Sequence, residues 1–411
     1  MSNSARFGWT RSLATGQLRR HRAAGYLSCP RVEWACWHDD AARAERLLGW
    51  TWGGAAPFDA DRFLRSHAGR SIAFVGDSLV RQQYVSLVCL LWSAAAFRDV
   101  RRLHQSKTLS IVVSSTHNLT LSYARSRFLV PKLNETLRVD EVSEALRAAI
   151  ALEPDVLLLS AGNWYEPRLV GVASEAAVLE QFRAALGSVR QLLRRTLRSK
   201  RRLSRVVVRT MPHRHFYGGA WDTGGRCNFT SPLPADSALW KDAALQRHVA
   251  AARDFSRLLT EELGPVAGVS VLDVGASSLH RADAHVGLFR CPRCQQLCRK
   301  DRPRAAGRCS EWIYDCSHYC LPGVPDVWNA LLQELLDAPA ASHHPWGRAS
   351  ARAASRRPAD SLSASPTRRL SALGGAAARS LRGHERQALA FDGGWRRRRV
   401  GGGGGGGGVG G

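Results

Sequence analysis

Two short stretches of the sequence contain the residue types of a serine acyl-transfer site. The first is Gly76-Asp77-Ser78, which lies between the apolar run at 71–76 and a segment from Leu79 whose apolar residues recur at helical spacing. A serine at such a junction lies at the carboxyl end of a strand and the amino end of a helix, where open sheets bind ligands and negative charge is favoured. Asp77 or Ser78 could instead simply cap the helix, so the motif needs a partner elsewhere.

The segment from Asp315 to His318 is the candidate partner. The two residues are three apart and precede a helical pattern, so both side chains can project from one turn toward a common point. The chain order serine, aspartate, histidine allows a nucleophile, an orienting acid and a base to meet in space. In this interpretation His318 takes the proton of Ser78, while Asp315 fixes the ring tautomer. An isolated Asp-x-x-His is more often a surface turn, and only its pairing with Gly-Asp-Ser gives it weight.

Alternating strands and helices must position these residues. The strands are predicted at 71–76, 110–115, 119–124, 155–162, 205–211 and 268–275. The helices are predicted at 175–198, at 237–263 and in the segment after Pro325. This order is typical of an α/β fold in which helices cover both faces of a mostly parallel sheet. The region 1–70 is irregular, and we expect its part from residue 25 to form a minor lobe beside the sheet.

Composition separates a folding part of the chain from a tail. Of 411 residues, those from 339 to 411 are rich in Arg, Ser, Ala and Gly and are predicted to be disordered, because they cannot bury enough apolar surface. The remaining length suits one α/β unit with a small lobe. The formal charge of +25 would attract nucleic acid, anionic glycans or a membrane surface. No nucleic-acid fold motif is present, so we expect no nucleic-acid partner.

Cysteines and glycosylation sequons favour the secretory pathway. The ten cysteines permit full pairing in an oxidising lumen, and sequons occur at Asn118, Asn134 and Asn228. However, residues 1–24, which we assign to an N-terminal extension, contain no apolar run long enough for a signal peptide or an anchor. A truncated start and a true lack of targeting both remain open.

These features together resemble the plant trichome-birefringence-like proteins. Their PC-esterase domain is a branch of the SGNH/GDSL superfamily, and its members act as polysaccharide O-acetyltransferases. The resemblance covers residues 25–338, the expected catalytic domain. Its main segments are CPRVEWAC, FDADRFLRSHAGRSIAFVGDSLVRQQYVSLVCLL, DVLLLSAGNWY, VVVRTMPHRHFYGGAWDTGGRCN and DCSHYCLPGVPDVWNALL.

The resemblance implies a fold and an activity. The fold would be an SGNH-hydrolase-like three-layer α/β/α unit with a small disulfide-linked N-terminal lobe. The activity would be transfer of acetyl to a cell-wall or matrix polysaccharide through an acyl-enzyme on Ser78, with Asp315 and His318 completing the triad. The acetyl donor would be acetyl-CoA or another carrier, with no bound cofactor. The family also implies a type II membrane protein of the Golgi lumen, so membrane association through a missing N-terminal anchor is possible. We expect a glycoprotein because of the sequons, and a monomer.

The family pattern is altered at two places near the site. Gln82 stands where the family has Asn, and we expect the longer amide to be tolerated. Asn163 directly follows Gly162, whereas the superfamily often has Gly-x-Asn and the plant proteins tend to have His there. The oxyanion donors would be the backbone amide of Ser78 with Gly162 and Asn163.

Further residues have candidate supporting roles. Arg81, one turn after Ser78, could bind an anionic donor group, support Asp77 or be a surface arginine. Trp164 and Tyr165 could hold a sugar ring or belong to the core, because aromatic side chains suit both. His215 fits a histidine position of the family and is a groove candidate.

The cysteines divide into two groups. Cys291, Cys294, Cys298 and Cys309 lie in an insertion at 286–312, where either local disulfides or a zinc ion could hold them; an oxidising lumen favours disulfides. For the other six, the resemblance implies the pairs Cys29–Cys89, Cys36–Cys320 and Cys227–Cys316.

Three classes of function remain open from the sequence. An acetyltransferase and an acetylesterase share the acyl-serine chemistry and differ in whether a sugar hydroxyl or water accepts the acyl group. A non-catalytic glycan-binding protein would be expected to lose a triad residue, and Ser78, Asp315 and His318 are all present.

Overall fold

The computed structural model describes a large part of the chain. The described residues are 8–11, 26–29, 34, 36, 47–94, 97, 99–106, 108–133, 136–199, 202–290 and 312–338. Several predicted features lie outside them: the tail at 339–411, Asn134, and the four cysteines at 291, 294, 298 and 309.

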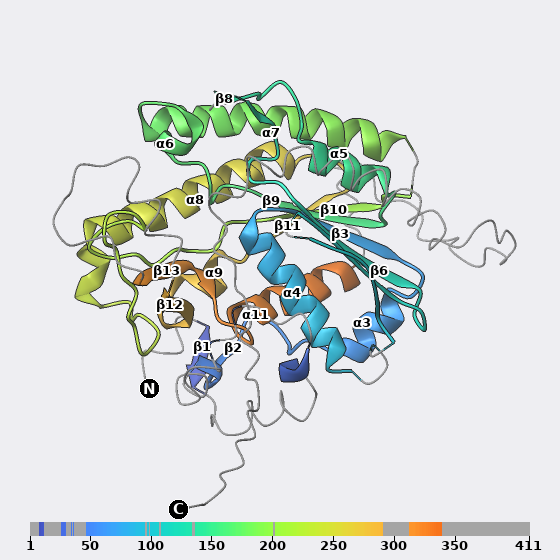
Figure 1. The fold of residues 1–411 in the computed structure, drawn as a ribbon, viewed down its shortest axis with the longest axis horizontal. Helices are drawn as coiled ribbons and strands as arrows, with labels where there is room; N and C mark the ends of the chain where they lie inside the picture. Colours follow the sequence, from blue (N-terminus) through green and yellow to red (C-terminus); the bar gives the residue numbers. More distant parts are fainter. Residues whose placement is uncertain are drawn as a thin grey trace, which may run out of the picture.

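A seven-stranded, mostly parallel sheet forms the centre of the fold (Figure 1). Its order is β11 (Val269–Leu272), β10 (Arg205–Arg209), β9 (Val156–Ser160), β3 (Ser71–Gly76), β6 (Leu119–Arg125), β5 (Leu109–Ser114) and β4 (Arg101–Gln105). The strands from β11 to β6 pair in parallel, whereas β5 and β4 extend the sheet in antiparallel fashion. The predicted fold class and all the predicted strands are therefore confirmed, and within this sheet only the edge strand β4 was not foreseen.

Helices cover the two faces of the sheet (Figure 1). Along β3, Ile72 and Phe74 face one apolar cluster, and Ala73 and Val75 face the other, as the two-residue period of a strand requires. The first cluster includes residues of α3 (Ala60–Ser66), α4 (Ser78–Trp92) and α11 (Val324–Asp337). The second includes residues of α5 (Glu144–Ala151), α7 (Glu175–Arg198) and α8 (Ala243–Leu263).

One predicted helix is divided by a cap. The segment predicted at 237–263 begins as a 3₁₀ turn, Ala238–Lys241, and continues as α8 from Ala243. Between them the Asp242 carboxylate accepts hydrogen bonds from the backbone N–H groups of Ala244 and Leu245. An aspartate in this position satisfies helix-end donors and starts a new helix.

The carboxyl end of β3 is the switch point of the sheet. The chain passes from β3 to β6 on one side and returns to β9 on the other, so ligand-binding residues are expected here. Gly76 ends β3 close to β9, because a Cβ on this residue would come within 2.5 Å of the Ser160 carbonyl oxygen.

Of the three two-stranded sheets in the described residues, two correct predicted boundaries, and the third pairs β7 (Lys132–Leu133) with β8 (Thr136–Leu137). Strand β1 (Trp9–Arg11) pairs with β2 (Trp50–Trp52), so part of the predicted extension at 1–24 packs with the minor lobe. Strands β12 (His285–Arg290) and β13 (Trp312–Tyr319) form an antiparallel pair that borders the insertion predicted at 286–312. Asp315 and His318 therefore lie on a strand, and not on a turn before a helix.

Candidate active site

Ser78 is the first residue of α4 and directly follows the switch point. Asp77 caps this helix, since its Oδ1 accepts hydrogen bonds from the N–H groups of Leu79 at 2.9 Å and Val80 at 3.4 Å. Ser78 itself is half-buried, so the cap is Asp77 and the hydroxyl of Ser78 is left for another partner. The carbonyls of Gly76 and Asp77 both accept from the Tyr123 hydroxyl, which fixes the turn from below.

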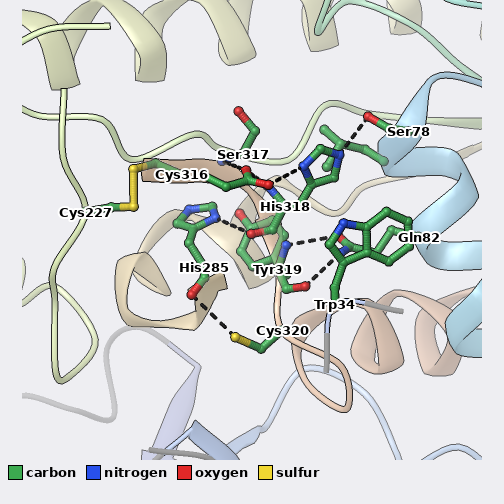
Figure 2. A network of polar contacts seen from close by, with 12 residues as sticks. Trp34, Ser78, Gln82, Cys227, His285, Cys316, Ser317, His318, Tyr319 and Cys320 are labelled. Carbon is green, nitrogen blue, oxygen red and sulfur yellow. Dashed lines mark hydrogen bonds and ion pairs between the residues drawn. A yellow bond between two sulfur atoms is a disulfide. The ribbon is translucent and has the colours of Figure 1, made fainter. Parts of the chain in front are cut away.

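The side chains of Ser78, His318 and Asp315 form one hydrogen-bonded row. Figure 2 shows the contact between Ser78 and His318. His318 Nε2 lies 2.8 Å from Ser78 Oγ, and His318 Nδ1 lies 2.7 Å from Asp315 Oδ2. Because a carboxylate can only accept, the proton of the neutral ring is on Nδ1, and Nε2 is free to accept from the serine hydroxyl.

A bulge in β13 lets Asp315 and His318 meet. In a regular strand, residues three apart point to opposite faces. Here Asp315 pairs with Gly287 and Tyr319 pairs with His285, so the β13 side contains two more residues than the β12 side. Asp315 Oδ1 closes this bulge by accepting from the N–H groups of Ser317 and His318, at 3.1 and 2.9 Å. The sequence interpretation was thus right about the common point and wrong about the element.

The environment keeps Asp315 ionised. Burial raises the pKa of its carboxyl, but the charge of His318 and the hydrogen bonds from His318 and Ser317 outweigh burial, and the pKa lies below its ordinary value. A permanent carboxylate at this place favours the protonated form of the imidazole.

Arg209, at the end of β10, is a charged neighbour of the site that the sequence did not single out. Its guanidinium donates to the Leu79 carbonyl at 3.1 Å and to Gln83 Oε1 at 3.4 Å, and is fully buried. Burial raises the pKa of Asp77, and the charge of Arg209 partly opposes this. Burial also lowers the pKa of Arg209 to about 10. The charge that supports Asp77 is therefore that of Arg209, whereas the guanidinium carbon of Arg81 lies 5.7 Å from the centre of the Trp34 ring.

Gln82 connects the nucleophile helix to the strand of the histidine. Its Nε2 donates to the Tyr319 carbonyl at 2.7 Å, and its Oε1 accepts from the Tyr319 N–H at 3.0 Å (Figure 2). Both backbone groups of the residue after His318 are therefore bound to the residue four positions after Ser78. These two hydrogen bonds explain the presence of an amide side chain at position 82.

The predicted oxyanion residues lie at the end of the neighbouring strand β9. Gly162 has φ of 137°, and a Cβ there would lie 2.0 Å from Met211 Sδ, so only glycine fits. Asn163 is half-buried, and its Oδ1 has no hydrogen-bond partner within the described part of the chain. Trp164 is partly buried beneath the Arg127 guanidinium carbon, 4.4 Å from the ring centre.

Two of the predicted groove residues belong to the interior. Tyr165 is 2% exposed, donates its hydroxyl to the Phe128 carbonyl and packs edge-on against Phe182. His215 is fully buried, with Nδ1 at 2.7 Å from His285 Nε2 and Nε2 at 2.7 Å from the Leu279 carbonyl. Neither side chain can line a sugar groove. The core alternative therefore holds for Tyr165, and the groove assignment of His215 was wrong.

Three disulfides connect the site to the rest of the molecule. The pairs are Cys29–Cys89, Cys36–Cys320 and Cys227–Cys316, which are the pairs that the resemblance implied. Cys316 lies inside the bulge and Cys320 directly follows β13, so two of the three bonds among the described cysteines act on the strand that carries His318. Figure 2 shows the bond between Cys227 and Cys316. Of the sequon residues, Asn118 and Asn228 are exposed.

Removal of the Cys227–Cys316 bond should impair catalysis more than stability alone explains. We expect the double variant Cys227→Ser/Cys316→Ser to lose a few kcal/mol of stability, about as much as Cys29→Ser/Cys89→Ser. Its activity at a temperature where both variants are folded should fall further, because only Cys316 lies between Asp315 and His318. Circular dichroism and initial rates of acyl transfer measure the two effects, and equal activity of the two folded variants would contradict this role of the bond.

The described residues contain no group of three or more His, Cys, Asp or Glu side chains that could hold a metal ion. Within the same residues no helix is long and apolar enough to cross a bilayer.

Comparison with known proteins places residues 56–335 in a single family model. The family is PC-Esterase, described as a GDSL/SGNH-like acyl-esterase family found in Pmr5 and Cas1p.

Individual relatives come from Arabidopsis thaliana. Xyloglucan O-acetyltransferase 1 is 30% identical over 68% of this chain and 67% of its own length. Protein trichome birefringence-like 13 is 27% identical over 72% and 76%, and Protein YLS7 is 26% identical over 68% and 59%. The chain thus spans about three fifths of YLS7. A solved mutant of Axe2, an acetyl-xylooligosaccharide esterase from Geobacillus Stearmophilus, is 13% identical over 69% of this chain and 98% of its own, with a TM-score of 0.31.

Proposed function

Because the chain belongs to the PC-esterase family of GDSL/SGNH-like acyl-esterases, we propose that it is a polysaccharide O-acetyltransferase that forms an acetyl-enzyme on Ser78. The observation that carries the proposal is the row from Ser78 Oγ through the His318 ring to the Asp315 carboxylate. The relative named xyloglucan O-acetyltransferase 1 supports transfer to a glycan. The family description as acyl-esterases supports a second candidate, an acetylesterase with the same site and water as the acceptor.

The first half-reaction transfers acetyl from the donor to the serine. Ser78 Oγ attacks the acetyl carbonyl carbon while its proton passes to His318 Nε2, 2.8 Å away. Asp315 holds the Nδ1–H of His318 and stabilises the imidazolium. The lowered pKa of Asp315 keeps its carboxylate charged for this role. We assign stabilisation of the negative charge on the carbonyl oxygen to the backbone amide of Ser78, at the amino end of α4, and to Gly162 and Asn163, which follow β9. The tetrahedral species then expels the donor group, which takes the proton from His318.

The second half-reaction repeats these steps with the acceptor. A sugar hydroxyl gives its proton to His318 Nε2 and attacks the acetyl carbon of the acyl-enzyme. Collapse of the tetrahedral species forms the sugar ester, and the proton of His318 returns to Ser78 Oγ. Trp164, at the end of β9, is the remaining groove candidate for a sugar ring.

The acetyl donor and the compartment belong to the same proposal. The donor is acetyl-CoA or another acetyl carrier, with no bound cofactor needed for the chemistry. Three disulfides and the sequons favour an oxidising secretory compartment such as the Golgi lumen, where a polysaccharide acceptor is met. The proposed active unit is a monomer that comprises residues 25–338 together with strand β1, which pairs with β2.

Product analysis separates transfer from hydrolysis. The purified full chain is incubated with acetyl-CoA or a chemically activated acetyl ester and a panel of neutral and acidic polysaccharides, and acetyl groups are followed by NMR. Acetyl appearing on a glycan supports the transferase. Release of free acetate alone, from donors and from acetylated glycans, would replace it with the esterase. The Ser78→Ala variant is the blank for both.

The pH dependence of kcat/KM should show an acidic limb caused by His318. The imidazolium cannot accept the serine proton, so activity is lost as the pH falls through the His318 pKa and is regained above it. Because the pKa of Asp315 is lowered, its carboxylate stays ionised across this range and adds no second limb. Initial rates with a small acetyl ester between about pH 5 and pH 9 measure the profile. A rate independent of pH over this range would exclude a histidine base.

A further inference from the structure

We propose that Trp34, from the N-terminal lobe, is a positioning residue that stabilises the imidazolium form of His318 by stacking on its ring. The inference rests on the proposed function for its catalytic meaning, but the contact between the two rings is a property of the fold. Their ring centres lie 5.4 Å apart with an angle of 17° between the planes. Figure 2 shows both side chains at the site.

The orientation distinguishes this pair from the other histidine–aromatic contacts of the described residues. The angle between the ring planes is 88° for His67 and Phe63, 81° for His280 and Trp240, 51° for His248 and Phe216, and 33° for His285 and Tyr319. The nearly parallel rings of Trp34 and His318 instead place the imidazole over the face of the indole. That face carries the negative end of the ring quadrupole, which attracts a cation, and tryptophan attracts cations more strongly than other aromatic residues do.

The chain around Trp34 is bonded directly to the chain that follows His318. Trp34 is 4% exposed, and it lies between Cys29, bonded to Cys89 of α4, and Cys36, bonded to Cys320. Its carbonyl also accepts from the N–H of Leu321 at 2.9 Å. The lobe is therefore fastened to the chain two and three residues after His318, and the stack does not depend on the Trp34 side chain alone.

Other charged groups around His318 come from three elements. Asp315 on β13 is its ion-pair partner, and Asp77 on α4 lies near enough to interact electrostatically with it. Arg81 on α4 is a cation close to the Trp34 ring, and His285 on β12 contacts the His318 carbonyl through Nδ1 at 3.0 Å. The contacts of His318 with Asp315, Asp77 and His285 do not involve the Trp34 side chain, so a change at Trp34 leaves them in place. The contact between Arg81 and the indole ring is lost together with the stack.

The stack favours the transition state over the ground state. His318 is neutral before the serine attacks and becomes positively charged only as the proton arrives, so an attraction specific to the cation lowers the barrier. Burial against an apolar surface has the opposite effect, because it disfavours the charged ring. The sign of the change in the His318 pKa after Trp34 is removed therefore decides between a cation–π role and simple shielding from water.

NMR titration of His318 tests the proposal without reference to activity. We expect the His318 pKa to fall by roughly 0.5 to 1 unit in Trp34→Leu, and by less in Trp34→Phe, which retains a weaker aromatic face. Trp52→Leu is the matched control, because Trp52 belongs to the same lobe and packs on Trp9. The signal of His318 is assigned from the His318→Gln variant. An unchanged or raised His318 pKa in folded Trp34→Leu would overturn the proposal.

Kinetics give the second measurement. In Trp34→Leu the acidic limb of kcat/KM should move to lower pH by the same amount, and kcat should fall by roughly tenfold. If Trp34→Leu does not fold, the His318 pKa values of wild type, Trp34→Tyr and Trp34→Phe decide. The pKa should be highest in the wild type and lower in the two variants, because tryptophan has the aromatic face that attracts cations most strongly. Equal His318 pKa values in the three proteins would contradict the proposal. If no acyl donor is turned over by the wild type, the proposed function fails, while the NMR result still supports or refutes the stack.

Discussion

Substitution of Ser78 by alanine should lower kcat for acyl transfer by roughly 10⁴-fold or more, with the fold unchanged. The hydroxyl is the only atom lost that His318 Nε2 contacts, and Ser78 is half-buried at the first position of α4, where alanine keeps the helix. Rates with a small acetyl ester and with a glycan acceptor measure the loss, and thermal unfolding measures the fold.

A nearby serine supplies the matched control. Ser317 lies in the bulge and contacts Asp315 through its backbone N–H, so Ser317→Ala keeps that bond and should retain most activity. Asp315→Asn and His318→Ala should each cost a large part of the rate. Combined with Ser78→Ala they should add little, because the three residues act as one unit. Near-normal turnover by folded Ser78→Ala would exclude the serine mechanism.

Replacement of Arg209 by methionine should be the most destabilising single change near the site. The variant leaves Asp77 buried without its opposing charge, and it removes the donor to the Leu79 carbonyl. Leaving a buried charge without a nearby opposite charge costs roughly 3–5 kcal/mol. Urea unfolding measures this cost. Arg81→Met is the control with a small expected effect, because Arg81 lies on α4 near the same site and is partly exposed.

The pH dependence of this destabilisation has a definite sign. The pKa of Asp77 is already raised by burial in the presence of Arg209, and it should rise further when Arg209 is absent. A carboxyl whose folded pKa exceeds its unfolded value destabilises the protein above the folded pKa and ceases to do so as the pH falls toward the unfolded value. The difference in unfolding free energy between the Arg209→Met variant and the wild type should therefore decrease at mildly acidic pH. An increase of this difference there would mean that the charge of Asp77 does not cause the destabilisation.

Local sequence patterns predicted the main architecture because its strands are parallel and buried. Continuous apolar runs such as 71–76 and 155–162 have few alternative structures, and α7 was predicted at its observed bounds. The edge strand β4 begins with two arginines and has no continuous apolar run, so its sequence does not distinguish it from a loop. Strand β13 was missed since its bulge interrupts the alternation that marks a strand.

The triad residues could be named from motifs, but their neighbours could not. Trp34, Gln82 and Arg209 acquire their roles from contacts with segments far away in the chain, which no local spacing displays. The errors at Tyr165 and His215 have the related cause that residue type does not reveal burial. A tryptophan between two cysteines of the lobe was the one available signal for Trp34, because both neighbours tie it to the rest of the molecule.

The separation of 284 residues between Cys36 and Cys320 has a consequence for biogenesis. A ribosome that adds about 5–20 residues per second needs roughly fifteen seconds to a minute to make the intervening chain. During that time Cys36 is a thiol beside Cys29 and Cys89, which are already available to each other. The nascent chain can thus form a non-native disulfide before Cys320 is synthesised. We therefore expect correct packing of Trp34 on His318 to depend on a disulfide isomerase in the compartment where the protein matures.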